Sequence, residues 1–245
     1  MPKSESPKKR PGEISKRDEI KSRRKREERK RQLVPIVLIS LAAVVLVVLL
    51  ILPNLLPKAV NSRPLESGTN MGNPNAAVVV EEFADFQCPS CAYFFNDYEP
   101  NIVQKYVSTG LIYFKFVPFS FLGPESIAAA QAAYCANDQG KFWQYHDTLY
   151  VNQKGENQGW FSTARLVDFA KTLNLDTTQF KTCLDTEKYK QKVQDDLEYG
   201  KQKGIDRTPS FLVNGRLVYA DTVTAVIDSE IKAKATAGAS PTATK

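Results

Sequence analysis

Residues 76–91 read AAVVVEEFADFQCPSC, and they combine an apolar run with two cysteines. The β-branched stretch 76–83 is typical of a buried strand. Cys88 and Cys91 follow it, and we expect a helix over 91–107, with Gly110 just beyond its end. If a helix begins near Cys88, its free N–H groups and positive dipole end favour a thiolate there, and Cys91, one turn later, can close a disulfide with it. The stretch therefore predicts dithiol–disulfide chemistry, with half of a zinc site as the alternative for this spacing.

The remaining pattern predicts the order of elements around this stretch. Residues 111–119 (LIYFKFVPF) form a second strand, and 123–204 are mainly helical. Helices are expected over 126–137, 140–151, 162–173 and 186–203, and Ser162 and Asp176 are candidate N-caps. Strands 210–213 and 216–220 flank Asn214-Gly215, a two-residue hairpin signal, and a helix over 221–234 closes the domain. The order β-α-β, helices, β-β-α predicts an α/β, thioredoxin-like fold with a helical insertion at about 123–204.

The positive charge of the chain belongs to its N-terminal arm. The 245 residues carry a formal charge of +6, but residues 1–31 hold 14 Lys or Arg and 6 Asp or Glu, which is +8, so the rest carries −2. Such an arm is compatible with nucleic-acid binding. The apolar segment that follows favours a different role, a determinant of membrane topology, and we expect no nucleic-acid partner.

The apolar sequence of residues 33–56 predicts one transmembrane helix before the domain. Val34 to Leu56 contains no charged residue and has about the ~20 residues that cross a bilayer. A cleaved signal peptide is the alternative, but the basic region and the apolar run are both longer than such peptides have. The excess of Lys and Arg places residues 1–32 in the cytoplasm and the chain after Leu56 outside it. We therefore expect a single-pass protein of the cell membrane with an extracytoplasmic domain.

The composition beyond the anchor fits this location. Residues 57–75 are rich in Pro, Gly, Ser and Asn and predict a flexible tether, the domain spans 76–235, and 236–245 predict a disordered tail. All four cysteines lie outside the arm and the anchor, as expected where disulfides form. The chain has one histidine, His146, which argues against a His-rich metal site and is more simply a structural residue than a catalyst.

Over residues 76–234 the chain resembles the membrane-anchored bacterial branch of the DsbA-like thiol:disulfide oxidoreductases. The motifs that carry the resemblance are EFADFQCPSC at 82–91 and GIDRTPSFLVNG at 204–215, about 120 residues apart, with GKFWQYHD at 140–147 between them. The resemblance implies that Cys88 is the exposed, attacking sulfur and Cys91 the buried resolving thiol. Pro89 and Ser90 tune the pair; well-known members have histidine where this chain has Ser90, so we expect an oxidant that need not be an extreme one.

The second motif implies the substrate-binding residues. Pro209 matches the family's cis-proline beside the disulfide, and Thr208 before it offers backbone groups to a substrate peptide, with a hydroxyl that approaches Cys88. An ordinary trans proline is the alternative. We also expect Phe86 and Phe211 to frame an apolar patch around the disulfide that grips unfolded chains.

The resemblance further places a buried acid beneath the disulfide, to exchange a proton with Cys91. Glu82 matches this position, six residues before Cys88, and burial would raise its pKa. Glu81 and Asp85 are the alternative acids, because strand alternation allows only one of Glu81 and Glu82 to face the site.

Cys135 and Cys183 lie in predicted helices of the insertion. Because some relatives have a second disulfide in this region, the resemblance implies a structural Cys135–Cys183 bond, with two free buried thiols as the alternative. The bond would close a loop of about 48 residues and stabilise the fold by roughly 3–4 kcal/mol.

Together these expectations describe a monomeric dithiol oxidase that donates its Cys88–Cys91 disulfide to unfolded or reduced exported proteins. A quinone-linked membrane oxidase of the DsbB or vitamin K epoxide reductase type would reoxidise it, and no bound cofactor or metal is needed, because the cysteines carry the electrons. The alternatives are a reductase or isomerase of the same fold and a non-catalytic chaperone or adaptor. A tether too short for a dimerisation domain disfavours the isomerase.

Overall fold

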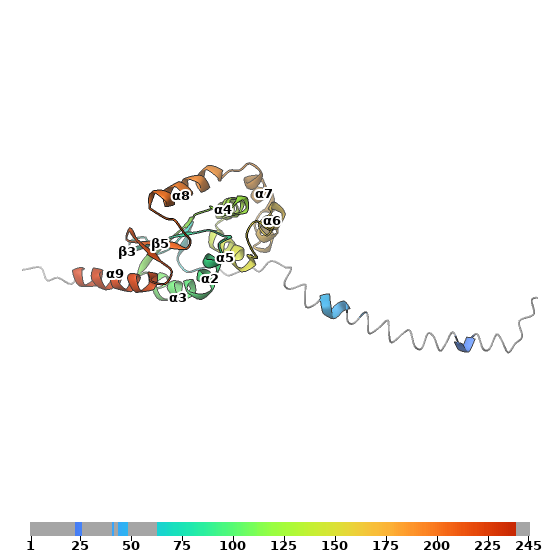
Figure 1. Ribbon diagram of the computed structural model, residues 1–245, viewed down its shortest axis with the longest axis horizontal. Coiled ribbons are helices and arrows are strands. Elements are labelled where there is room, and N and C mark those ends of the chain that lie inside the picture. Colours follow the sequence, from blue (N-terminus) through green and yellow to red (C-terminus); the bar gives the residue numbers. More distant parts are fainter. Residues whose placement is uncertain (1–22, 26–40, 42–43, 49–62, 239–245) are drawn as a thin grey trace, which may run out of the picture. The chain divides into compact units, whose positions relative to one another are not determined.

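The computed structural model describes residues 23–25, 41, 44–48 and 63–238, and only the last range forms a folded domain (Figure 1). Most of the predicted arm and anchor, residues 1–32 and 33–56, therefore lies outside the described residues. Within the described ranges, no helix is both long enough and apolar enough to cross a membrane.

One mixed sheet forms the centre of the domain. Its six strands lie in the order β1-β2-β4-β3-β5-β6. Their bounds are β1 Glu66–Ser67, β2 Asn70–Gly72, β3 Val78–Ala84, β4 Ile112–Pro118, β5 Ser210–Val213 and β6 Arg216–Tyr219. As predicted, β3 and β4 run parallel and β5 and β6 form an antiparallel hairpin at the edge. Asn214 and Gly215 both have positive φ, 50° and 81°, the backbone that this two-residue turn requires.

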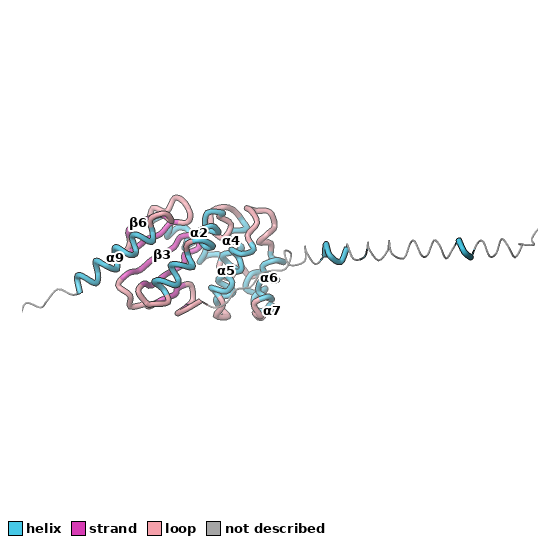
Figure 2. The backbone as a smooth tube through the Cα atoms, turned by 90° about the horizontal axis from the view of Figure 1, so that it is seen from below, coloured by secondary structure: helices cyan, strands magenta, loops and turns pink. Residues whose placement is uncertain are grey.

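The helices follow the predicted order closely. They are α2 Pro89–Asp97, α3 Glu99–Ile102, the π-helical turn η1 Val103–Val107, α4 Pro124–Asn137, α5 Phe142–Asn152, α6 Thr163–Thr172, α7 Thr177–Asp185, α8 Lys190–Gln202 and α9 Val223–Gly238. The insertion thus consists of α4 to α8 (Figures 1 and 2). Asp176 caps α7 by accepting from the backbone N–H groups of Thr178 and Gln179, whereas Ser162 stands at the N-cap position of α6 without a capping side-chain bond.

Two helical layers cover the sheet. In Figure 1, α8 lies on one side of the strands and α9, with α2 and α3, on the other. On the α8 side, Phe83 packs with Phe119 and Leu212, and its ring lies 5.7 Å from that of Tyr199 of α8. On the other side, Phe211 of β5 packs against Phe94 of α2, with ring centroids 4.7 Å apart. Successive residues of β3 therefore face different helices, which decides where each acid of this strand points.

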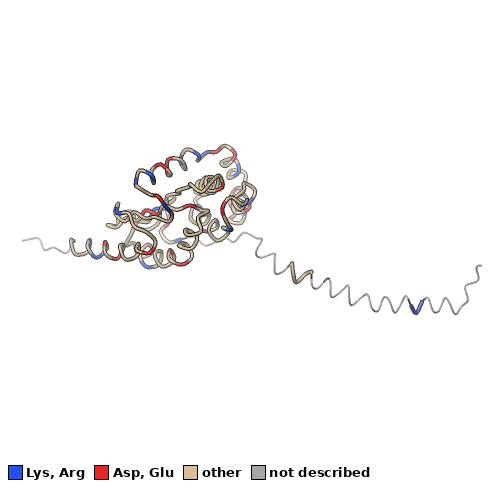
Figure 3. The backbone as a smooth tube through the Cα atoms, in the orientation of Figure 1, with Lys and Arg blue, Asp and Glu red and all other residues tan. Residues whose placement is uncertain are grey.

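The outer face of α8 is a solvated, charged surface. Lysines and acidic residues are interspersed along it (Figure 3), and Lys201–Glu198 is an exposed ion pair within the helix. Lys192 pairs with Asp196, which is itself buried and accepts from the Tyr134 hydroxyl. Pairs at this spacing support a helix only weakly. The burial of Val193 and Gly200 on the inner side indicates that packing holds α8 in place.

Two predicted helix boundaries were wrong. The single helix expected over 91–107 is broken at Tyr98, because Pro100 lacks an N–H group and its ring conflicts with the carbonyl of Asn96 in a continuous helix. The last predicted helix reaches Gly238 and so enters the expected tail, of which residues 239–245 lie outside the described part.

The predicted flexible tether also needs correction. Of residues 57–75, the part from 63 onward is described and contains β1 and β2, which extend the sheet beyond β4. Met71 of β2 is fully buried, and Trp143 of α5 donates to the carbonyl of Asn70. Strands of two and three residues are too short to give a periodic sequence signal, so β1 and β2 were not predicted from this turn-rich segment.

Candidate functional site

Cys88 and Cys91 occupy the start of α2, directly after β3. Cys88 is the N-cap residue and Pro89 the first helical residue, where its missing N–H group costs nothing. Both cysteines are free thiols. The residue Cys88 is 8% exposed and Cys91 only 1%, while Pro89 and Ser90 are exposed. Both residues are thus buried, so the exposure expected for Cys88 is not seen, although Cys88 is the less buried of the two.

The two sulfurs differ in acidity. A hydrogen bond from the Cys91 thiol is the main cause that lowers the pKa of Cys88 to about 6, and backbone N–H groups of Cys91 and Ser90 add to it against the effect of burial. Burial raises the pKa of Cys91 well above its ordinary value, and the neighbouring Cys88 adds to this. At pH 7 a pKa near 6 gives about ten thiolates for each thiol. Cys88 is therefore a nucleophile and a good leaving group, and Cys91 is not.

The loop before β5 closes over Cys88. The Thr208–Pro209 peptide bond is cis, as expected, and the Thr208 carbonyl oxygen lies 3.5 Å from the Cys88 sulfur. The Thr208 hydroxyl is buried beside the two sulfurs, and it lowers the pKa of both Cys88 and Cys91. The structure thus brings together the two motifs that are about 120 residues apart in the sequence.

The three candidate acids, Glu81, Glu82 and Asp85, lie in different environments. Glu81 points to the α8 side, where Tyr199 donates to it and Lys115 pairs with it. Glu82 points to the α2 side, between Phe116 of β4 and Phe211 of β5 in the sheet. It is 2% exposed, and its Oε2 atom has no hydrogen-bond partner in the described part of the chain. Burial raises the pKa of Glu82 well above the ordinary value, Glu99 raises it further, and Arg63 lowers it.

Asp85 is an anchor of the active-site loop. Its carboxylate accepts from the backbone N–H groups of Gln87, Phe121 and Leu122 and from the Ser126 hydroxyl, at 2.6 to 3.1 Å. These bonds fix the segment before Cys88 against the β4–α4 connection. Asp85 therefore positions the loop, whereas Glu82 is the acid with an oxygen, Oε2, that has no hydrogen-bond partner among the described residues.

The expected substrate contacts of Phe86 and Phe211 are wrong. Both side chains are fully buried. Phe86 packs against Phe116 and Tyr150, and Phe211 against Phe94. Nearness to the cysteines in sequence and in the sheet gave no information on exposure, and both residues belong to the core beneath the site.

The comparisons with known proteins agree with this geometry. A family model described as thioredoxin matches residues 65–232. A probable disulfide bond formation protein D of Bacillus anthracis is 32% identical over 169 residues, which is 66% of this chain and 78% of the relative. The disulfide bond formation protein D of Bacillus subtilis is 32% identical over 184 residues, 72% of this chain and 83% of the relative.

A solved structure supports the same family assignment. The crystal structure of oxidised BdbD from Bacillus subtilis superposes with a TM-score of 0.63 and 30% identity, over 71% of this chain and 99% of that one. The chain belongs to the DsbA-like thiol:disulfide oxidoreductases. Chlamydia trachomatis DsbA, at 21% identity and a TM-score of 0.62, shares the fold.

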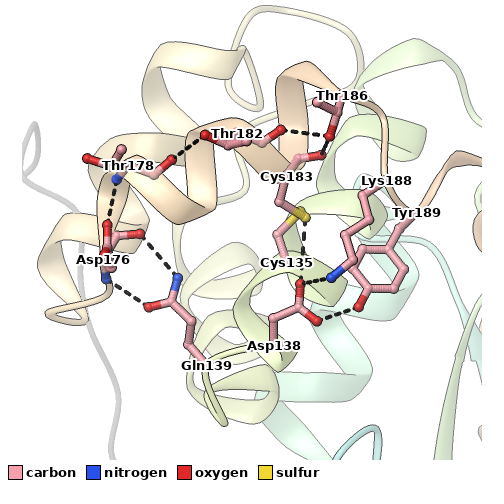
Figure 4. Close-up of a disulfide and its surroundings, with 10 residues drawn as sticks. All are labelled: Cys135, Asp138, Gln139, Asp176, Thr178, Thr182, Cys183, Thr186, Lys188 and Tyr189. Atoms are coloured by element: carbon pink, nitrogen blue, oxygen red, sulfur yellow. Dashed lines mark hydrogen bonds and ion pairs between the residues drawn. A yellow bond between two sulfur atoms is a disulfide. The ribbon is translucent and has the colours of Figure 1, made fainter.

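This DsbA-like domain also contains a second cysteine pair. Cys135 of α4 and Cys183 of α7 form a disulfide with a Cα–Cα distance of 5.9 Å (Figure 4). Beside it, Asp138 pairs with Lys188 and accepts from the Tyr189 hydroxyl. The bond joins two helices of the insertion, away from the Cys88–Cys91 pair in the sequence, which is consistent with a structural role.

Sequence reasoning missed several residues around the DsbA-like site. Gln153, just after α5, donates through Nε2 to the carbonyls of Phe86 and Cys88 at 2.6 and 3.1 Å. His146 is fully buried, as the structural interpretation expected, and its Nδ1 lies 2.8 Å from Asp147. No local pattern could have found the contacts of Gln153, because they join the insertion to the distant active-site loop. Within the described residues, no group of three His, Cys, Asp or Glu side chains could hold a metal ion.

Proposed function

We propose that this protein oxidises exported proteins by donating its Cys88–Cys91 disulfide. The observation that carries the proposal is the contrast between the two sulfurs, one of low pKa at a helix start and one buried and hard to ionise. A thiolate that leaves easily makes the corresponding disulfide oxidising. The names of the Bacillus relatives, which are disulfide bond formation proteins, support the same direction.

The reaction proceeds by two thiol–disulfide exchanges. A substrate thiolate attacks the Cys88 sulfur of the disulfide, a mixed disulfide forms, and Cys91 leaves as a thiolate that takes up a proton. A second substrate thiolate then attacks the substrate sulfur, and Cys88 leaves as a stable thiolate. Two substrate thiols are oxidised to one disulfide, and the enzyme disulfide is reduced to the dithiol.

Glu82 is the proton donor to Cys91 in this proposal. Burial raises the pKa of this carboxyl well above its ordinary value and Glu99 adds to this, so Glu82 keeps a proton that it can give to Cys91. The carbonyl of Thr208 beside Cys88 is placed to receive the backbone of a substrate peptide. Pro89 and Ser90, both exposed at the start of α2, face the approaching chain and tune the thiolate through the helix end.

The proposal also includes the location and the partner. Residues 33–56 anchor the protein as a single-pass membrane protein, with the arm 1–32 in the cytoplasm and the catalytic domain outside. A quinone-linked membrane oxidase of the DsbB or vitamin K epoxide reductase type then restores the disulfide. The apolar, uncharged run and the basic arm in the sequence support this topology.

Activity is tested by mixing the oxidised full-length protein, in detergent, with a reduced, denatured protein and counting the substrate thiols. The wild type should remove two thiols per enzyme molecule. The variant Cys88→Ser/Cys91→Ser should remove none, and the control Cys135→Ser/Cys183→Ser should retain the transfer. Equal activity of the first variant in cells would instead favour the chaperone or adaptor alternative.

Topology is tested with an epitope tag at either end and a protease added to intact spheroplasts. The C-terminal tag should be digested and the N-terminal tag protected. Protection of both tags would contradict the extracytoplasmic location.

A further inference from the structure

A buried ion-pair cluster lies beside α2 and is built partly by the segment before β1. Arg63 donates through Nε to Asp147 at 3.0 Å and through its other two nitrogens to Asp147 and Glu99. The side chains are 11%, 9% and 2% exposed, in the order Arg63, Asp147, Glu99. The guanidinium also lies 5.0 Å from the ring centroid of Trp143. Arg63 is thus held by α3 and α5 as firmly as a core residue.

The cluster is continuous with the redox site in two directions. Arg63 lies 5.7 Å from the ring of Phe95, which follows Cys91 by one turn of α2. Asp147 also bonds His146, and the His146 ring lies 4.5 Å from Phe116, the neighbour of Glu82 in the sheet. The chain of contacts therefore leads from Arg63 to both Cys91 and Glu82.

The charges in this region are unbalanced. Glu82 of β3, Glu99 of α3, Asp147 of α5 and Asp85 of the active-site loop are buried acids, and Arg63 is the cation that pairs with two of them. The other titratable groups that pack against this region include Cys88, Cys91, His146 and Tyr150, and Glu66, which accepts from the backbone N–H of Arg63. Glu99 opposes ionisation of Glu82 and Arg63 favours it.

In the proposed reaction, Glu82 becomes a carboxylate when it protonates the Cys91 thiolate. A new negative charge in a buried site is costly unless a cation compensates it. Arg63 is the described cation whose charge acts on Glu82. A cavity of about 560 Å³, lined in part by Arg63 and Asp147, borders the outer edge of the cluster, so this edge meets solvent whereas Glu82 does not.

We propose that Arg63 is a positioning residue of the redox reaction, which compensates the charge that Glu82 acquires each time it passes its proton to Cys91. The step is a proton transfer alone: the Glu82 O–H bond breaks, the Cys91 S–H bond forms, and Glu82 later regains a proton from solvent. The inference rests on the proposed role of Glu82, and it makes residues 63–72 part of the catalytic unit instead of a tether.

The test measures how fast the oxidised full-length protein is reduced by dithiothreitol, as a rate constant per reductant thiolate, over a range of pH. The rate constant of the wild type should fall as pH rises through the pKa of Glu82. Glu82→Gln should lose this fall. Arg63→Met should move it to higher pH, and Glu99→Gln, which keeps the cation and removes an opposing charge, should move it to lower pH. In Arg63→Met/Glu99→Gln the fall should return toward the wild-type position.

The control is Lys105→Met, which breaks the half-exposed ion pair with Asp228 and should leave the profile unchanged. If Arg63→Met is too unstable to measure, the comparison of Arg63→Met/Glu99→Gln with Glu99→Gln decides, because these two variants differ only in the cation. If the fall in the rate constant disappears in E82Q but keeps its wild-type pH in R63M and E99Q, the inference about Arg63 is overturned and the role of Glu82 stands. A profile unchanged in E82Q would overturn both.

Discussion

At the scale of single residues, the chemistry depends on the unequal environments of Cys88 and Cys91. The positive end of α2 and the thiol of Cys91 stabilise a thiolate at Cys88. Cys91 lies three residues later on the buried side of the helix and keeps its proton. The Cys88 sulfur is therefore the electrophile in the oxidised form, and it is a good leaving group when the mixed disulfide is resolved.

The pKa of Cys88 is the first prediction at this scale. The rate of alkylation of the reduced protein by iodoacetamide should rise with a midpoint near pH 6, and Cys91→Ala should shift the midpoint upward because the largest stabilising hydrogen bond is lost. Since the folded pKa is below the unfolded one, the thiolate stabilises the reduced form fully above the ordinary thiol pKa, and this contribution disappears as pH falls through about 6. A midpoint near that of a free cysteine would contradict the prediction.

Asp85 gives the second residue-scale prediction. Replacing it by alanine removes the acceptor of three backbone N–H groups and a hydroxyl in a buried site. Because unsatisfied buried donors cost about 1–3 kcal/mol each, Asp85→Ala should lower the free energy of unfolding by at least about 3 kcal/mol in urea denaturation. Asp228→Ala, at an exposed ion pair, is the matched control and should cost no more than about 1 kcal/mol. Equal losses in the two variants would show that Asp85 is not the anchor.

At the scale of elements, the Cys135–Cys183 disulfide joins α4 to α7 across 48 residues. Removing both sulfurs by Cys135→Ala/Cys183→Ala should lower the free energy of unfolding by about 3–4 kcal/mol, because the unfolded chain gains the entropy of the opened loop. Urea unfolding with Cys88 and Cys91 reduced in both proteins measures the difference. The reduction potential of Cys88–Cys91 should stay the same, and a large change in it would assign the second bond a redox role.

The strands β1 and β2 give the second prediction at this scale. A fragment of residues 70–245 lacks β1 and Arg63, and so leaves Glu99 and Asp147 buried without their cation. Loss of one partner of a buried ion pair costs about 3–5 kcal/mol. The fragment should therefore unfold at a markedly lower urea concentration than a fragment of residues 62–245. Identical urea midpoints of the two fragments would show that residues 63–69 do not stabilise the domain and act only as a tether.

The contrast between these elements shows what the sequence could predict. The strand before Cys88, the helix after it and the Asn214-Gly215 hairpin have local signals, namely periodicity and turn residues, and all three were found. The β1–β2 pair and the cluster around Arg63 depend on contacts between distant segments, which no local pattern encodes. Exposure was the weakest inference, as Phe86 and Phe211 show, because nearness to the active site does not decide whether a side chain faces solvent or the core.

At the scale of the whole molecule, the fold brings four distant segments to one point. The start of α2 supplies the cysteines, the β5 loop supplies Thr208, α5 and its end supply His146 and Gln153, and the segment before β1 supplies Arg63. The helical insertion therefore also builds the site, because its residues Gln153 and Asp147 contact the active-site loop and Arg63.

The proposed function requires the Cys88–Cys91 disulfide to be an oxidant, and the reduction potential of this pair is the measurement to make first. The full-length protein would be equilibrated with glutathione buffers, and Cys135 and Cys183 would be followed separately by mass after thiol labelling. A potential of about −120 to −180 mV is predicted, in the range of disulfide donors. A potential near about −270 mV, that of thioredoxin, would contradict the account and assign the protein to the reductases.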